Sequence, residues 1–428
     1  MSIGTMILNE REAREARGTI GEYENALSSE SALSAIVEGL PPQVIDGYRR
    51  ALEVEKRELE ALIKAYDAAK SGEDAELRRI AGNDPGYALI IARITSGLTQ
   101  KELGRRLGVK EQQIQRYEAD RYRTISLSNF QKVANTLGVQ WDMKLTKWNR
   151  GGWALAKDAS AKELTKIIKH ARSHDWFEKE NEKAEAEDSV SYLQRYVTDH
   201  IVRYGTPSLL RTGLNVVDCN NDMALLAWKA RVTRRAETII SKQKIQYKPL
   251  DVSWLIDLVR LSQKIDAPQK ARELLLSKGI VLIVEPQIPG MKVDGAAFLL
   301  DGVPVIGMTL RRDTIDNFWF TLLHELGHVI LHYRTGLASG FFDDTENVEV
   351  DEIEAEANRF AGNLLIPDDV WNRSPARIAK SAPVIEKFAR HQGIHPAIVF
   401  GRIQKERNNY AVFSNKLGRG KVKEQLLP

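Results

Sequence analysis

The residues with the clearest capacity for chemistry are two histidines and a glutamate in the segment NFWFTLLHELGHVILHY (317–333). His324 and His328 are four residues apart, so on a helix their imidazoles lie on one face, one turn apart. Two imidazoles so placed can bind one Zn²⁺ at about 2.0–2.1 Å. Glu325 is adjacent to the first of them and can take a proton from a water that the metal activates. The spacing therefore predicts a zinc site with Glu325 as general base.

The same three residues can also occur by chance in a buried helix. The helix that carries them has a broad apolar face, formed by Trp319, Leu322, Leu323, Leu326, Val329 and Ile330. Burying two unpaired imidazoles and a carboxylate in such a helix would be costly. The segment also follows a predicted hairpin, which can offer an edge strand to an extended peptide. These two features favour the metal site.

A third protein ligand has to come from elsewhere in the chain. A histidine six residues after His328 would give the metzincin pattern, but that position is Arg334. His332 lies on roughly the same face as His328, and we expect it to shape the pocket or to fill the helix end. The remaining candidate is a glutamate from a second predicted helix, residues 352–367.

On that second helix the apolar residues define a buried side, which selects among its glutamates. Glu354 shares this side with Ala357 and Phe360, whereas Glu356 lies about 200° away and should be more exposed. We therefore expect His324, His328 and Glu354 as metal ligands, with water as the fourth. Asn358, one turn past Glu354, is placed to hydrogen-bond one of the two histidines and orient it.

The elements that position these residues are mostly helical. GIVLIVEP (279–286) predicts a strand, and Asp301-Gly302 predicts a hairpin turn just before the metal-site helix. The fold class is thus mainly α with a small β-sheet (α+β), and at 428 residues several domains are expected. We predict these divisions: 1–85, an N-terminal helical region with a candidate dimerising helix at 44–80; 86–142, a helix-turn-helix; 143–275, a helical middle region; 276–410, the metal-site domain; 411–428, a tail. The helix at 44–80 carries an apolar stripe that Glu55 interrupts, which indicates either packing on its own domain or a short dimerising coiled coil.

Composition restricts the class of protein further. Hydrophobic residues are 43% and charged residues 28%, with a net charge of +4, as in a globular protein. The single cysteine, Cys219, excludes a disulfide framework and a cysteine-rich zinc site. We read it as a small buried residue rather than an inhibitory thiolate on the metal. The absence of a signal peptide and of a long apolar run predicts a cytoplasmic protein with no membrane partner.

A second functional segment is LTQKELGRRLGVKEQQIQRYEADRY (98–122). Thr99 and Glu102 form a capping box at the start of one helix, and Gly108 follows its last turn. A second helix begins near Lys110 and presents polar side chains that can read base edges in a major groove. The candidate DNA contacts are Gln100, Lys110, Glu111, Gln112, Gln113, Gln115 and Arg116. The alternative is a helical hairpin with no role in nucleic-acid binding.

This segment closely resembles the Xre/Cro-type helix-turn-helix family. The resemblance rests on the Leu-Thr-Gln start, the glycine at the turn, the Ile-x-x-Tyr-Glu exit and a downstream Leu-Gly-Val, and it covers about residues 86–142. It implies binding to an operator in double-stranded DNA, and the segment also looks like antitoxin repressors of this family. One departure is Lys110, where the family usually has a serine or threonine cap.

The metal-site region resembles the ImmA/IrrE family of metallopeptidases over about residues 275–410. The resemblance rests on His-Glu-Leu-Gly-His followed by Glu-x-x-Ala-Asn-x-Phe-Ala-x-x-Leu-Leu-x-Pro. It implies a gluzincin-like domain that binds Zn²⁺ with a glutamate as third ligand. It also implies cleavage or inactivation of a partner repressor in stress, mobile-element or defence settings. The departures are Ile366, where methionine is frequent, and the joining of both domains in one chain.

The sequence thus predicts a DNA-binding transcriptional regulator with a zinc-dependent endopeptidase domain. We expect it to act as a homodimer and to cleave a partner repressor or itself. An alternative is a non-catalytic antitoxin or repressor, paired with a toxin, whose metal site is structural or sensory. A further alternative is that residues 143–275 bind an effector such as single-stranded DNA or a nucleotide through the basic stretch 233–244, although a solvated helix face explains that stretch equally well.

Overall fold

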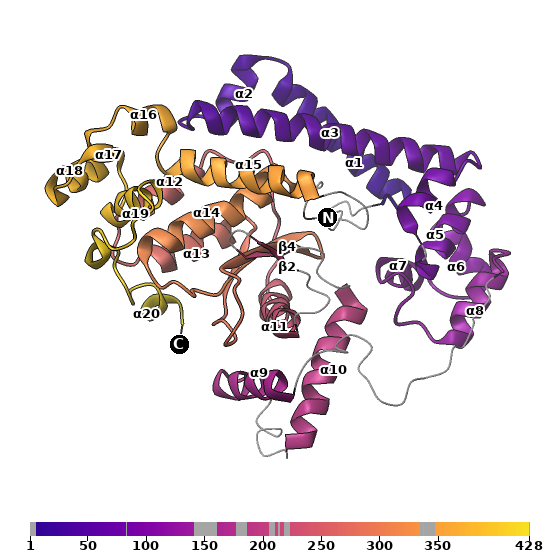
Figure 1. Cartoon of the computed structure of the whole chain (residues 1–428). Helices are drawn as coiled ribbons and strands as arrows, with labels where there is room; N and C mark the ends of the chain where they lie inside the picture. The colour runs from indigo at the N-terminus through magenta and orange to yellow at the C-terminus, as the bar shows by residue number, and fades with distance from the viewer. Residues whose placement is uncertain are drawn as a thin grey trace. The chain divides into compact units, whose positions relative to one another are not determined.

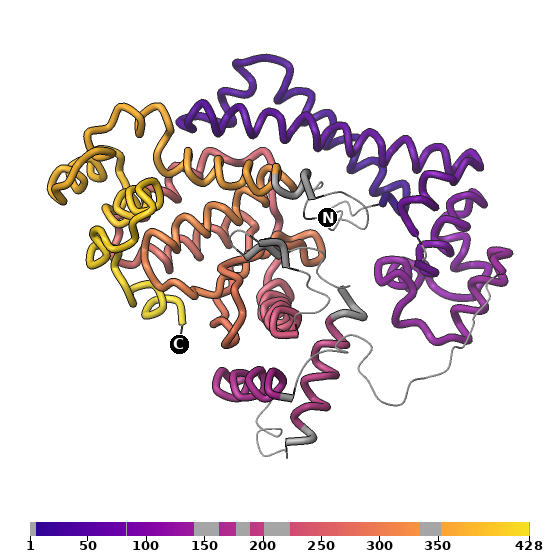
Figure 2. The backbone as a smooth tube through the Cα atoms, in the orientation of Figure 1, coloured from indigo at the N-terminus to yellow at the C-terminus, as the bar shows by residue number. Residues whose placement is uncertain are grey.

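A computed structural model describes residues 6–82, 84–140, 161–176, 186–204, 210–212, 215–217, 223–333, 337 and 347–427. Most of these residues are helical, and one three-stranded sheet lies among the helices (Figure 1), so the predicted fold class is confirmed. The backbone, traced in Figure 2, divides into two compact units, one within residues 1–29 and 52–151 and the other within 30–51 and 152–428. No helix in the described part of the chain has the length and apolarity needed to cross a membrane.

The first unit is entirely helical in its described residues. It contains α1 (Glu10–Leu27), the later turns of α3 (Pro42–Lys70), α4 (Ala75–Ala81), α5 (Pro85–Thr95), α6 (Gln100–Leu107), α7 (Glu111–Ala119) and α8 (Leu127–Thr136). Helix α1 lies in the region predicted to be helical, but no individual helix was predicted before residue 44. It begins where the Asn9 side chain accepts hydrogen bonds from the backbone N–H groups of Arg11 and Glu12.

The long helix predicted over residues 44–80 is in fact two helices. It breaks after Lys70 because Gly72 adopts a left-handed backbone with φ +98°, which glycine tolerates without steric cost. Leu59 and Tyr66 of the predicted apolar stripe are buried within the chain. Glu55, expected to interrupt the stripe, is also buried. These side chains of the stripe therefore pack within their own chain.

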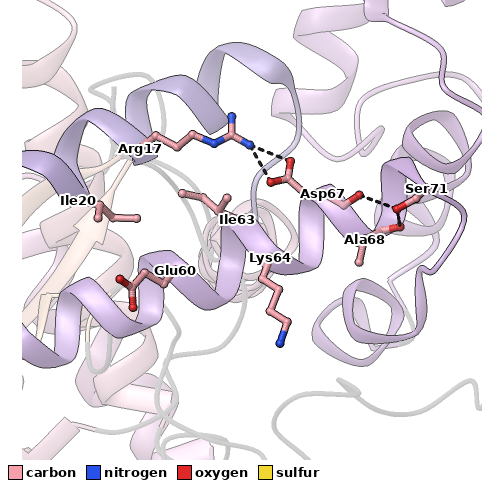
Figure 3. Close-up of a pocket in the computed structure, with 8 residues that line it drawn as sticks. All are labelled: Arg17, Ile20, Glu60, Ile63, Lys64, Asp67, Ala68 and Ser71. Carbon is pink, nitrogen blue, oxygen red and sulfur yellow. Dashed lines mark hydrogen bonds and ion pairs between the residues drawn. The ribbon is translucent and has the colours of Figure 1, made fainter.

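Helices α1 and α3 are joined by ion pairs along a shallow groove (Figure 3). The guanidinium of Arg17 donates to both carboxylate oxygens of Asp67, at 2.8 Å each. Ile20 and Ile63 line the same groove between charged side chains. These bonds fix α1 against α3.

The second unit holds the sheet and the metal-site helices. Before the sheet it contains α2 (Glu30–Ile36), the first turns of α3, α9 (Ala161–Ser173), α10 (Ala186–Tyr204), β1 (Leu210–Thr212), β2 (Asn215–Val217), α11 (Met223–Ile240), α12 (Leu255–Leu261) and α13 (Ala267–Ser277). The sheet consists of β3 (Val281–Val284), β4 (Gly295–Leu300) and β5 (Val303–Met308). After it come α14 (Ile315–Leu331), α15 (Asn347–Leu365), α16 (Asp368–Asn372), α17 (Pro375–Ile378), α18 (Ala382–Gln392), α19 (Pro396–Glu406), the 3-10 turn η3 (Ser414–Lys416) and α20 (Lys423–Leu426).

The middle region departs from the helical prediction at β1 and β2, which pair antiparallel. Cys219 lies outside the described residues. The predicted hairpin is present, since β4 pairs antiparallel with β5 across a turn at Asp301 and Gly302. The strand order is β3-β5-β4, with β3 parallel to β5. In the described chain β4 has a strand on one side only, so its other edge is free of strand pairing.

Two helices cover opposite faces of this sheet. A Cβ at Gly307 would lie 2.8 Å from the Trp228 ring of α11, and a Cβ at Gly295 would lie 3.0 Å from Thr321 of α14. Gly307 pairs with Ala296, so Gly307 and Gly295 point to opposite faces because side chains alternate along a strand. The helix that carries His324, Glu325 and His328 therefore packs directly on β4.

Candidate metal centre and nucleic-acid surface

Close packing of two helices builds the candidate metal centre. Leu322, Leu323 and Leu326 of α14 are fully buried, and α15 lies alongside α14 (Figure 1). Gly327 permits this approach, since a Cβ there would lie only 3.2 Å from the Ala357 Cα of α15. The packing brings Glu354 of α15 to the two histidines of α14.

The three predicted ligands converge on one point. His324 Nε2 lies 3.2 Å from His328 Nε2 and 3.3 Å from Glu354 Oε2. The other carboxylate oxygen of Glu354, Oε1, lies 3.5 Å from His328 Nε2. A tetrahedral zinc with bonds of about 2.0–2.1 Å holds its donors about 3.3 Å apart. Both the donor types and their separations thus fit Zn²⁺, and these residues form a group that could hold a metal ion.

The protonation of these donors also suits a cation. Burial lowers the pKa of His328 to about 4, so its ring is neutral at pH 7. Burial opposes charge on Glu354, but hydrogen bonds from His324 and His328 hold the pKa of its carboxyl well below the usual range. Burial likewise opposes charge on His324, yet the hydrogen bond to Glu354 and the nearby carboxylates raise its pKa. These carboxylates favour a positive charge at His324, and a bound metal ion would supply that charge in place of the proton.

Glu325 lies between the donor cluster and strand β4. Its side chain is buried, and Gly295 of β4 leaves the space it occupies, because a Cβ there would lie 2.7 Å from Glu325 Oε1. The backbone N–H of Ala297 favours the charged form of this carboxyl. Burial raises the pKa of Glu325 to about 7, against the lowering effect of His324. Such a carboxyl can both accept and release a proton near neutral pH.

The side chains around the donors lie close to where the sequence placed them, with one addition. Asn358 Oδ1 is 3.2 Å from His324 Nδ1, which makes it the neighbour of His324 rather than of His328. Glu356 is more exposed than Glu354, at 31% against 13% of the side chain. His332 does more than fill the helix end, since it contacts both His328 and Glu356. Sequence reasoning did not assign Glu356 to the site.

The helix-turn-helix segment forms the two predicted helices, α6 and α7. Thr99 and Glu102 make the reciprocal capping box, and Gly108 ends α6 with φ +70°. Lys110 occupies the cap of α7 and makes no side-chain capping bond, as its side-chain type implies. Ile114 of α7 is fully buried.

The seven candidate DNA contacts do not share one environment. Lys110, Glu111, Gln112, Gln115 and Arg116 are exposed, whereas Gln100 and Gln113 are half-buried. The Gln100 amide donates to Glu118 Oε2 at 2.7 Å, and the Gln113 amide donates to the Tyr117 hydroxyl. The side chains of these two glutamines are therefore engaged within the protein, and the exposed five form the accessible face of α7 and its cap.

Sequence reasoning missed the buried ion pair behind that face. Arg93 Nε lies 2.5 Å from Glu118 Oε1, and both side chains are buried. Arg93 also donates to the backbone carbonyls of Leu98 and Leu8. The sequence feature that could have indicated this ion pair is the single arginine, Arg93, in the otherwise apolar stretch ALIIARIT (88–95).

Comparison with known families agrees with this geometry. Residues 89–143 match the family model described as helix-turn-helix, and residues 279–392 match the one described as an IrrE N-terminal-like domain. Both matches fall where the sequence resemblances placed them. No curated protein and no solved structure matches the chain. All three donors of the candidate metal centre lie inside the second match.

Proposed function

We propose that this protein is a DNA-binding transcriptional regulator with a zinc-dependent endopeptidase site. The proposal rests on the presence of a helix-turn-helix domain and an IrrE-like domain in one chain. The proposed ligands are His324, His328 and Glu354, and the proposed base is Glu325. The observation that carries the proposal is the buried carboxyl of Glu325, held between these donors and an edge strand. The substrate is a partner repressor or the chain itself, in a stress, toxin–antitoxin, mobile-element or defence setting.

The residues around the site divide the work of peptide hydrolysis. Zn²⁺, when bound, supplies a Lewis acid that polarises the scissile carbonyl and activates water. Glu325 takes the proton of the attacking water and passes it to the leaving amine. Asn358 holds the His324 ring through Nδ1. An extended substrate segment adds to the free edge of β4, which brings its backbone next to Glu325.

The position of Glu325 favours catalysis over a purely structural metal site. A structural zinc needs ligands but no neighbouring acid. Burial raises the pKa of Glu325, so an ionised carboxylate there lowers the stability of the fold. A residue that costs stability beside a metal site is typical of functional sites.

Removal of zinc tests the peptidase proposal. Full-length chain, loaded with one equivalent of Zn²⁺, is incubated with a lysate of its own host, and new N-termini are identified by mass spectrometry. We expect at least one protein, the chain itself included, to gain a terminus that a chelator abolishes and added Zn²⁺ restores. An identical set of termini with and without zinc would contradict the proposal.

The exposed face of α7 is the proposed base-reading surface. Arg116 and Gln112 are exposed and carry the side-chain types that bind guanine and adenine edges. A single helix-turn-helix reads few base pairs, so we propose that two copies bind one operator. The side-chain amide of Gln100 already donates to Glu118. We therefore propose that the backbone N–H of Gln100, in the first turn of α6, binds a DNA phosphate.

Substitution of Arg116 tests this surface. A DNA site is first selected from a random library with the full-length chain, and binding is then followed by fluorescence anisotropy at several salt concentrations. We expect Arg116→Ala to weaken binding by about 1–3 kcal/mol and to relax preference at one base position. Arg79→Ala is the matched control, because Arg79 is an exposed arginine of α4 in the same unit, outside the helix pair. Equal losses for both variants would argue against base reading by α7.

A further inference from the structure

His332 and Glu356 lie behind His328, on the side away from the other donors. His332 follows the last residue of α14, where the backbone has left the helical conformation with φ −128° and ψ 31°. Its Nδ1 lies 3.3 Å from His328 Nδ1, and its Nε2 lies 3.1 Å from Glu356 Oε2. The His332 side chain is 5% exposed, so water does not compete strongly for these bonds.

These distances admit one arrangement of hydrogens when His328 binds a metal. His328 Nε2 faces His324 and Glu354, and a metal ligand carries no hydrogen on that atom. The ring hydrogen of His328 is then on Nδ1 and is donated to Nδ1 of His332. His332 must carry its own hydrogen on Nε2, where the carboxylate of Glu356, an acceptor only, receives it.

Both histidine ligands are thus held from behind by residues of α15. Asn358 Oδ1 contacts the outer nitrogen of His324 directly, at 3.2 Å. The outer nitrogen of His328 contacts His332 instead, and His332 in turn contacts Glu356 of α15. One helix therefore supplies the third donor, Glu354, and the groups that orient the other two rings.

We propose that Glu356 and His332 form a positioning relay that fixes the ring orientation and tautomer of His328 and so raises the affinity of the site for Zn²⁺. The proposal rests on the metal site proposed above. Groups that hold the outer nitrogen of a histidine ligand typically change metal affinity 10–100-fold when they are removed. Glu356 and His332 are positioning residues here, because they act on the site through His328.

The decisive substitution is Glu356→Gln. Glutamine has the same shape but can donate as well as accept, so it no longer forces the hydrogen of His332 onto Nε2. Zinc affinity of the full-length chain is measured by competition with a chromophoric chelator. We expect about 10–100-fold weaker binding, in a chain whose metal-free form still unfolds in one cooperative transition.

Two control variants separate the relay from loss of charge or of a surface contact. Glu352→Gln removes the same charge from an exposed position of α15, and we expect zinc affinity within about twofold of wild type. Arg359→Gln removes an ion-pair partner of Glu356. The Nη2 of Arg359 lies 3.9 Å from Glu356 Oε1, and the arginine side chain is 58% exposed. This variant should also leave the affinity nearly unchanged.

A double variant tests whether Glu356 acts through His332. His332→Phe should weaken zinc binding as Glu356→Gln does, and adding Glu356→Gln to it should cause no further loss, because the connection is already broken. Wild-type affinity in Glu356→Gln, or additive losses in the double variant, would overturn the relay while leaving the metal site in place. A wild-type chain that binds no zinc would overturn the metal site, and the relay with it.

Discussion

Replacement of Glu325 by glutamine is expected to slow the zinc-dependent cleavage by about 10²–10⁴-fold, the usual contribution of a general base. Glutamine has nearly the same shape as glutamate and fits the space that Gly295 leaves. It cannot take a proton from water. The rate is measured as the appearance of the zinc-dependent fragment under single-turnover conditions.

The zinc content of Glu325→Gln decides how a loss of activity is interpreted. Glu325 is not among the three clustered donors, so we expect one equivalent of zinc to remain bound. Glu352→Gln is again the matched control, since it removes a carboxylate from an exposed position of the same unit. Cleavage at the wild-type rate in a fully zinc-loaded Glu325→Gln chain would remove the peptidase proposal and leave the structural or sensory metal site as the better explanation.

How much of the candidate site could be predicted depended on helical periodicity. His324, His328 and Glu354 follow from spacing on two regular helices, and their positions in the structure converge accordingly. The relay could not be predicted, because His332 was treated as one more residue on the same helical face. In the structure it lies past the helix end, and its ring bridges two helices. Side-chain direction at a helix end depends on tertiary packing, which local periodicity does not specify.

For the fold, too, the local elements could be predicted from the sequence, but the contacts between distant segments could not. The hairpin was predicted from Asp301-Gly302, but the parallel pairing of β3 with β5 joins segments far apart in sequence. Helix α1 was missed because its buried face consists largely of alanine, at positions 13, 16 and 26, and so gives a weak apolar pattern. Its Asn9–Glu12 capping pair was the available signal: the Leu8 N–H donates to Glu12 Oε2 at 2.8 Å.

The second large effect is expected in the DNA-binding unit, from Glu118→Ala. This change leaves the Arg93 guanidinium buried without its carboxylate, and breaking a buried ion pair on one side costs about 3–5 kcal/mol. It also removes the acceptor of the Gln100 amide. Domains are stable by only about 5–15 kcal/mol, so much of the unit's stability is at stake. Hydrogen exchange followed by mass spectrometry on the full-length chain should show faster exchange in peptides from residues 85–136.

A double replacement shows whether the loss comes from the stranded charge rather than from lost packing. In Arg93→Met with Glu118→Leu no buried charge remains, and such apolar replacements of a buried pair are often neutral. We expect slow exchange to return only in part, because Arg93 also donates to the carbonyls of Leu98 and Leu8, and methionine leaves both without that donor. If Glu118→Ala alone exchanges as slowly as wild type, the pair contributes little to the unit. If the double variant is as unstable as Glu118→Ala, losing the Arg93 contacts with the carbonyls of Leu98 and Leu8 costs as much stability as the stranded charge, and Arg93 stabilises the unit through these backbone contacts as well as through Glu118.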